Sequence, residues 1–175
     1  MCYIFKISYF FCKNQLIFLF KLYSAGHLRR MQLSCCRGLS HEGFNETLRK
    51  LPLLEELEIS QNKQLSNDSL EIVGQCCPLL KSLKYSRHPL DDIEMNDVAF
   101  AIAKTMPGLH HLKISGDELS NDGVLAVLDG CPLLETLDLK DCKYVSMRLS
   151  VWRRSREQIK DFGLPSQDYY SSVRI

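Results

Sequence analysis

The stretch CPLLETLDLKDC, residues 131–142, decides the fold because near copies of it recur along the chain. LPLLEELEIS (51–60), CPLLKSLKYS (77–86) and MPGLHHLKIS (106–115) precede it, and each has a proline followed two residues later by a leucine. A first copy, LRRMQLSCC (28–36), lacks the proline but keeps the spacing. A phrase repeated at near-constant intervals indicates one structural unit used several times.

The copies agree column by column when they are aligned on their first leucine, here called position 0. These leucines are 25 to 29 residues apart, and apolar residues follow at positions +3 and +5. A period of this length with an L-x-x-L-x-L core is typical of leucine-rich repeats. Position +8 holds a side chain that can hydrogen-bond in every copy. Such a side chain suits a tight turn, where backbone N–H and C=O groups would otherwise lack partners. These residues are Cys36, Asn62, His88, Asp117 and Cys142.

Helix signals fill the intervals between the predicted strands. The segments 39–48, 65–74, 94–103 and 119–128 carry Ser, Asn or Asp within their first four residues, and these residues favour helix N-caps. In the last of them, Gly130 is expected to take the left-handed C-terminal position, and Pro132 stops the helix. No single unit can bury its leucines, so the units must stack. We predict an α/β solenoid of about five strand–helix repeats with a parallel sheet on its concave side.

Composition and motifs argue against most catalytic classes. The formal net charge is +1, so no global field attracts nucleic acid or anionic lipid. P-loop, G-x-S-x-G and G-x-G-x-x-G motifs are absent, and His110-His111 on a strand would point to opposite sides. We therefore predict no enzyme, cofactor, metal site, nucleic-acid partner or membrane partner. The eight cysteines contain no CxxC pair and favour a reduced chain in the nucleus or cytoplasm over a secreted one.

Binding residues are expected on the concave face, where positions +2 and +4 point away from the core. Their charges alternate along the solenoid and would select a protein partner by electrostatic complementarity; simple solubility is the other interpretation. The candidate protein-binding residues are Arg30, Gln32, Glu56, Glu58, Ser82, Lys84, His111, Lys113, Thr136 and Asp138.

Two irregular segments leave alternatives open. The third repeat is longest, and its extra residues fall in 86–97, where an insertion either forms a binding loop or is neutral variation. The basic run 148–160 around Trp152 either binds nucleic acid or forms the solvated face of a closing segment. We favour the solvated face.

The repeat pattern divides the chain into three parts. Residues 28–142 form the repeat solenoid, and residues 143–175 form a C-terminal closing segment and tail. Residues 1–27 are an apolar leader that we do not expect to be a native domain. A terminal repeat exposes apolar side chains unless it is capped, so we expect a marginally stable chain unless Leu16, Phe18 or Phe20 cover the first repeat.

CPLLKSL, CPLLETLDLKDC and LSNDGVLAVLDGCPLLETLDL resemble the cysteine-containing repeats of F-box/leucine-rich-repeat proteins, most of all the short plant group of Skp-adaptor-interacting partners. The segment 157–169, EQIKDFGLPSQDY, is similar to the one that follows the last repeat in that group. The resemblance implies that the repeats recognise a substrate protein for a cullin-type (SCF) ubiquitin ligase. In that family a small N-terminal F-box binds the Skp-type adaptor.

The F-box itself is not recognisable in this chain. Residues 1–27 do not resemble one, and the Leu-Pro pair at 51–52 lies inside a repeat. We expect adaptor binding only where the full-length protein supplies an F-box. A stand-alone repeat protein that binds partners without a ligase is the alternative.

Overall fold

The computed structural model describes residues 4–8 (backbone), 27–36, 39–87, 95–116, 119–143, 145–146 and 149–163. Strands and helices alternate along the chain. The strands are β1 (Ile4–Ser8), β2 (Arg30–Ser34), β3 (Glu56–Ser60), β4 (Ser82–Ser86), β5 (His111–Ser115), β6 (Thr136–Asp138) and β7 (Asp161–Gly163). The helices are α2 (His41–Leu48), α3 (Asn67–Cys76), α4 (Met95–Thr105), α5 (Asn121–Gly130) and α6 (Leu149–Gln158).

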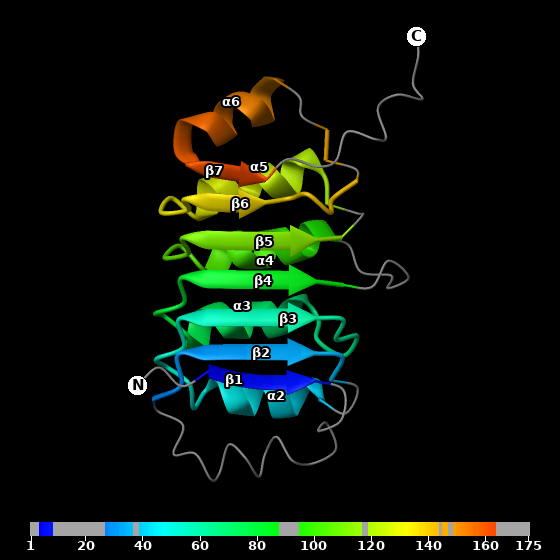
Figure 1. Ribbon diagram of the computed structural model, residues 1–175, viewed down its shortest axis with the longest axis vertical. Helices are drawn as coiled ribbons and strands as arrows, with labels where there is room; N and C mark the ends of the chain where they lie inside the picture. Colours follow the sequence, from blue (N-terminus) through cyan, green and yellow to red (C-terminus); the bar gives the residue numbers. More distant parts are fainter. Residues whose placement is uncertain are drawn as a thin grey trace.

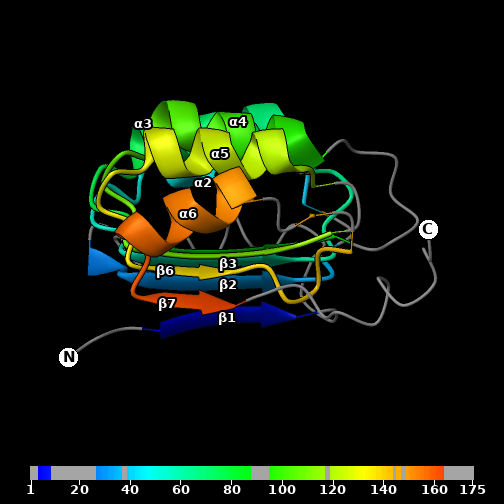
Figure 2. The same ribbon diagram turned by 90° about the horizontal axis from the view of Figure 1, so that it is seen from above.

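The molecule has two layers, a sheet and a row of helices. The seven strands lie side by side in chain order, and each pairs in parallel with the next. All the described helices cover the same face of the sheet, and none of them lies on the other face, here called the open face (Figures 1 and 2). The predicted leucine-rich-repeat solenoid is therefore confirmed.

The register of the sheet follows the repeat columns. Leu57 pairs with Leu83, and Glu58 pairs with Lys84, as their equal positions in the repeat require. Positions +3 and +5 point to the helices and are almost fully buried, with Leu83 at 0% and Ile59 at 1% exposure. Alternation along a strand then sends positions +2 and +4 to the open face.

The turn that follows each strand is held by the +8 column. After β2 and β3, the buried Cys36 N–H donates to Asn62 Oδ1 at 2.6 Å, and Asn62 Nδ2 donates to the Leu33 carbonyl at 3.1 Å. Further along, Cys142 Sγ donates to the Ile114 carbonyl at 3.2 Å. The predicted turn role is confirmed at these positions, whereas His88 and Asp117 lie outside the described residues.

The predicted side-chain caps form at the starts of α2 and α5, whereas Ser66 before α3 makes no side-chain cap hydrogen bond and one helix end differs from the prediction. Ser40 Oγ and Ser120 Oγ accept from backbone N–H groups of the first turn, at 3.1 and 3.2 Å. The expectation of a left-handed Gly130 is wrong, because no glycine in the described ranges has a positive φ. Gly130 is instead the last residue of α5, and a Cβ there would lie 2.3 Å from the Ala103 carbonyl oxygen. Its lack of a side chain lets α5 approach the backbone of α4.

Two strands lie beyond the five expected repeats. β1 falls within the leader and pairs with β2, and β7 falls within the closing segment and pairs with β6. Both strands follow the repeat pattern. In β1, Phe5 and Ile7 precede Met31 and Leu33 of the next repeat by 26 residues and pair with them. In β7, Phe162 pairs with Leu137 of the preceding repeat. Next to β1, Met31 and Leu33 are only 3% and 1% exposed.

Two predicted features lie outside the described part of the chain. Leu16, Phe18 and Phe20, which are expected to cover the first repeat, belong to it. So do positions 88–94 of the predicted insertion, on either side of which Ser86 ends β4 and Met95 begins α4.

Candidate protein-binding surface

The open face of the sheet brings all ten predicted residues together in two adjoining hollows. The first, of about 170 Å³, is lined by Arg30, Met31, Gln32, Glu56, Leu57, Glu58, Ser82 and Lys84. The second, of about 380 Å³, is lined by Ser82, Leu83, Lys84, His111, Leu112, Lys113, Thr136, Leu137, Asp138, Lys140, Asp161 and Gly163. Ser82 and Lys84 on β4 belong to both, so the two hollows form one strip across the strands, here called the concave strip.

In the first hollow, three contacts join polar residues at equivalent positions of successive repeats. Arg30 Nε lies 3.0 Å from Glu56 Oε1, and Gln32 Nε2 donates to Glu58 Oε1 at 2.7 Å. Glu58 also faces Lys84, at 3.9 Å. The parallel register produces these contacts, because it places equal positions of successive repeats side by side.

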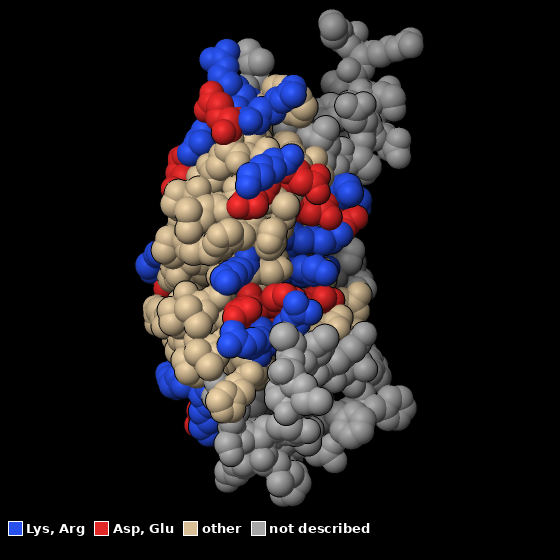
Figure 3. Space-filling model, turned by 60° about the vertical axis from the view of Figure 1, so that its left-hand side comes forward, with Lys and Arg blue, Asp and Glu red and all other residues tan. Residues whose placement is uncertain are grey.

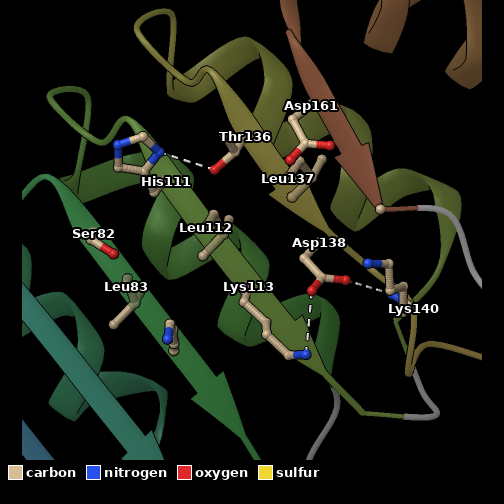
Figure 4. A pocket seen from close by; sticks show the side chains of 12 residues that line it. Ser82, Leu83, His111, Leu112, Lys113, Thr136, Leu137, Asp138, Lys140 and Asp161 are labelled. Atoms are coloured by element: carbon tan, nitrogen blue, oxygen red, sulfur yellow. Dashed lines mark hydrogen bonds and ion pairs between the residues drawn. The ribbon is translucent and has the colours of Figure 1, made fainter.

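The second hollow is built around Lys113 (Figure 4). Its Nζ lies 3.3 Å from Asp138 Oδ2 and 3.4 Å from Asp141 Oδ2. Asp138 also accepts from the Lys140 N–H at 3.1 Å. Beside this group, His111 Nδ1 and Thr136 Oγ1 are in hydrogen-bond contact at 3.0 Å.

These contacts shift two pKa values. Partial burial alone would lower the pKa of Lys113, but its hydrogen bond and attraction to Asp138, together with Asp141, raise the pKa above the ordinary value. Partial burial would raise the pKa of Asp138, but the Lys140 N–H and then Lys113 lower it overall. Both groups are therefore held in their charged forms.

The strip presents paired charges that remain accessible to a partner. The side chains of Lys84 and Arg30 are 59% and 46% exposed, and positive and negative groups alternate along this side of the molecule (Figure 3). Exposed ion pairs contribute only about 0–1 kcal/mol each. Exchanging them for contacts with a partner therefore costs little, and the alternating charges would fix the register of a bound protein.

Sequence reasoning missed the lining residues that β7 contributes. Asp161 and Gly163 belong to this strand, which was not expected to be a repeat strand. Lys140 follows the predicted pattern, because position +6 alternates to the same face as positions +2 and +4, and it lines the second hollow (Figure 4). The signal for β7 was the pair Ile159 and Phe162, which repeats the spacing of Leu134 and Leu137.

The histidine pair at 110–111 and the basic segment 148–160 make contacts with neighbouring residues of the fold. His110 Nδ1 contacts the Gly108 carbonyl at 2.9 Å, and its ring centroid lies 6.3 Å from that of His111. Within the described residues, no three His, Cys, Asp or Glu side chains are grouped as metal ligands. In the basic segment, Arg156 stacks over Trp152 at 5.2 Å, and Arg154 pairs with Asp129 at 3.3 Å.

Two buried cysteines on the helix side, Cys77 and Cys131, are held in the unreactive thiol form. Burial raises the pKa of the Cys77 thiol to about 12, with a smaller effect of Cys76, and burial raises the pKa of Cys131 to about 11. None of the six cysteines in the described part of the chain forms a disulfide. None of the described helices is long and apolar enough to cross a membrane.

Architecture and site define the chain as a leucine-rich-repeat protein with a charged concave strip. Its similarity to solved structures agrees: the fold matches a chain of the crystal structure of the yeast Rad7–Elc1 complex with a TM-score of 0.67 and 21% identity, over 93% of this chain and 44% of that one. No protein-family model matches the chain.

The sequence matches curated proteins of Arabidopsis thaliana. The chain is 43% identical to F-box protein SKIP19 over 83% of its own length and 47% of SKIP19. It is 39% identical to putative F-box/LRR-repeat protein 23 over 81% of this chain and 32% of that protein. With F-box protein FBW2 the identity is 29%, and the match covers 96% of this chain and 54% of FBW2.

The chain is thus homologous to plant F-box/leucine-rich-repeat proteins over most of its length. It spans about a third to a half of the length of these curated relatives. The predicted resemblance to this family is confirmed.

Proposed function

We propose that this chain is the substrate-binding region of an F-box/leucine-rich-repeat receptor of a cullin-type ubiquitin ligase. The concave strip binds the substrate protein, and the chain itself catalyses nothing. The observation that carries the proposal is the strip: ten polar side chains from five successive strands line one accessible surface in a chain homologous to F-box/LRR proteins.

The composition of the strip supports a protein partner over a small ligand. The strip runs across six strands, β2 to β7, and its polar groups are spread along it rather than converging on one point. Small-molecule sites are usually enclosed and mostly apolar with a few convergent polar groups. A long charged surface that crosses many repeats is the kind of site that solenoids use for proteins.

Adaptor binding is a separate part of the proposal. We expect the described repeats to bind the substrate, and the Skp-type adaptor to require an F-box supplied by the full-length protein. The proposed site of action is the nucleus or cytoplasm, where the ligase and reduced thiols are both present.

The experiment places a photo-crosslinking residue at Ser82, which lines both hollows. Crosslinked proteins are identified in plant cells for the parent chain, for Lys84→Ala with Lys113→Ala, and for an Arg153→Ala control on α6. We expect a partner that the parent and the control capture and the double variant loses. The half-life of that partner should lengthen when cullin ligases are inhibited.

Two outcomes would contradict the proposal in different ways. Equal crosslinking by the parent and the double variant would show that the strip is not the binding surface. A partner that depends on the strip but has an unchanged half-life would support the stand-alone interaction module. Circular dichroism melting of each variant confirms that the fold is retained.

A further inference from the structure

A second row of residues runs along the edge of the sheet where the strands begin. It consists of the residues at position +1, which are joined by backbone hydrogen bonds: each N–H donates to the carbonyl of the preceding row member at 2.8 Å. The row is therefore fixed in register by the backbone itself. Its members are Arg29, Glu55, Lys81, His110, Glu135 and Lys160.

In this edge row, residues at equal distances on the two sides of His110 carry opposite charges. One repeat to either side lie Lys81 and Glu135, and two repeats to either side lie Glu55 and Lys160. Each position on one side thus carries the charge opposite to its counterpart on the other side. Lys81 is exposed, and the side chains of Glu135 and Lys160 are 41% and 73% exposed while Lys160 Nζ lies 3.1 Å from Glu135 Oε1 of the same chain. Glu55, which pairs with Arg29 of the same chain, is 29% exposed.

A neighbouring row, one residue before position 0, contains two exposed leucines at equal distance from the His110 repeat and a third, partly exposed leucine, Leu53, in an earlier repeat. Leu79 and Leu133 follow the prolines that precede β4 and β6, and they are 44% and 54% exposed. Among the described residues, only three large hydrophobic side chains are this exposed, and these are two of them. Between them lies Gly108, where a Cβ would meet open space. Figure 3, in which this edge is turned forward, shows a broad uncharged surface there beside the charged groups.

We propose that this edge binds a second copy of the same chain, with the two-fold axis passing through the repeat of His110. In such a dimer the order of repeats is reversed across the contact and the rows face each other. Lys81 then meets Glu135 of the second copy, and Leu79 meets its Leu133. Contacts of this kind are self-complementary, as a two-fold interface requires.

The charge pattern excludes the neighbouring arrangements. Pairing with the repeats in the same order would place Lys81 against Lys81. A reversed pairing displaced by half a repeat would place Glu55 against Glu135 or Lys81 against Lys160. Like charges in contact are unfavourable. Only the arrangement centred on His110 combines opposite charges at two repeats on each side with facing leucines.

The contact would be modest and salt-sensitive. The ion pairs are exposed, so they contribute little each and weaken as salt rises. The dimer would also place both concave strips on the same side, so a partner with two binding segments would gain avidity. The dimer itself does not depend on the proposed function, because the edge row and the concave strip are different residues.

The first test is the association constant of the 175-residue chain, measured by sedimentation equilibrium at low salt. We expect Lys81→Glu and Glu135→Lys to weaken association at least about tenfold each, because each places like charges together. The double variant that carries both changes restores opposite charges and should recover association. Arg153→Glu on α6 is the matched charge-reversal control and should leave it unchanged.

Further variants separate the apolar contact from the charges. Leu79→Ala with Leu133→Ala should abolish association, whereas Phe100→Ala, which truncates the third exposed apolar side chain, should not. Gly108→Arg should also abolish it, because two arginines would meet on the axis while the fold has space for the side chain.

Zero-length carbodiimide crosslinking tests which residues meet across the contact. Mixing light and isotope-labelled chains distinguishes links between two chains from links within one chain. An intermolecular Lys81–Glu135 link is expected. A chain that stays monomeric at every concentration would overturn the proposal. So would a dimer that the double variant fails to restore, or one without the Lys81–Glu135 link.

Discussion

Replacing Gly130 by alanine should destabilise this protein, although the same change stabilises most helices. In an ordinary helix interior, alanine is more favourable than glycine by about 0.5–1 kcal/mol. Here a Cβ at Gly130 would lie 2.3 Å from the Ala103 oxygen, 2.6 Å from its Cα and 2.7 Å from its carbonyl carbon. These are backbone atoms of α4, so no side-chain rotation relieves the overlap.

The magnitude follows from the movement that the helices must make. Real Cβ atoms essentially never approach closer than 3.0 Å, so α5 must retreat from α4 by most of an ångström. Overpacking of this kind costs about 1–3 kcal/mol. Subtracting a gain in helix propensity of about 0.5–1 kcal/mol from a mid-range overpacking cost of about 2 kcal/mol leaves an expected net loss of about 1–1.5 kcal/mol in the free energy of unfolding.

Urea unfolding followed by circular dichroism of the helix signal measures this loss. Gly108→Ala is the control, because a Cβ there has no neighbour within 4 Å and stability should change by less than about 0.5 kcal/mol. A Gly130→Ala protein as stable as the parent, or more stable, would refute the reasoning and leave helix propensity as the dominant effect.

Three other measurements follow from the structure. Asn62→Ala should lower the free energy of unfolding by about 1–3 kcal/mol, since the buried Cys36 N–H loses its acceptor; equal urea midpoints would contradict this. With pKa values of about 12 and 11, Cys77 and Cys131 should resist alkylation at a pH of about 8 until the chain unfolds, which peptide mapping by mass spectrometry would show. The pKa of Asp138 lies below its ordinary value, so its contribution to stability is present above about pH 4 and is lost as the pH falls through the folded-state pKa. Asp138→Asn should therefore flatten the acid side of a stability–pH curve, and an unchanged curve would count against the Lys113 contact.

The repeat architecture was predictable because two periodicities in the sequence coincide. A spacing of 25 to 29 residues indicates equal units, and alternation within each unit assigns side chains to the core or to the open face. Equal units must stack in register, so the pairing of Glu58 with Lys84 follows from their common position. The concave strip could be identified residue by residue for the same reason.

The terminal strands were not predicted, because the repeat pattern is weaker there. β1 lacks the leading leucine and the proline, and β7 has Ile159 and Phe162 where the other repeats have leucines. β1 and β7 are the outermost strands of the described sheet, and outer repeats are usually atypical in sequence. The Pro-x-Leu signature that marks the inner repeats is therefore missing from the unit at each end.

The close approach of α4 and α5 could not be predicted, because it depends on a distance between elements. Gly130 precedes Cys131 and Pro132, a sequence typical of a glycine C-cap. A glycine at a helix end can be required for either of two reasons: its backbone adopts a positive φ, or a neighbouring element leaves no room for a side chain. The sequence looks the same in both cases. Only the position of Ala103 on the next helix distinguishes them.

The positions that determine the fold and those that select partners are different columns of the same repeat. Positions 0, +3 and +5 are fixed by core packing and stay apolar, and position +8 is fixed by the turn and keeps a side chain that can hydrogen-bond. Positions +1, +2 and +4 face solvent, and folding is satisfied by almost any polar residue there. The change from Glu58 to Lys84 to Asp138 along position +4 is therefore not required by the fold. Because complementarity is a property of two surfaces, these columns indicate where a partner binds and with which charges, whereas its identity depends on the partner's surface.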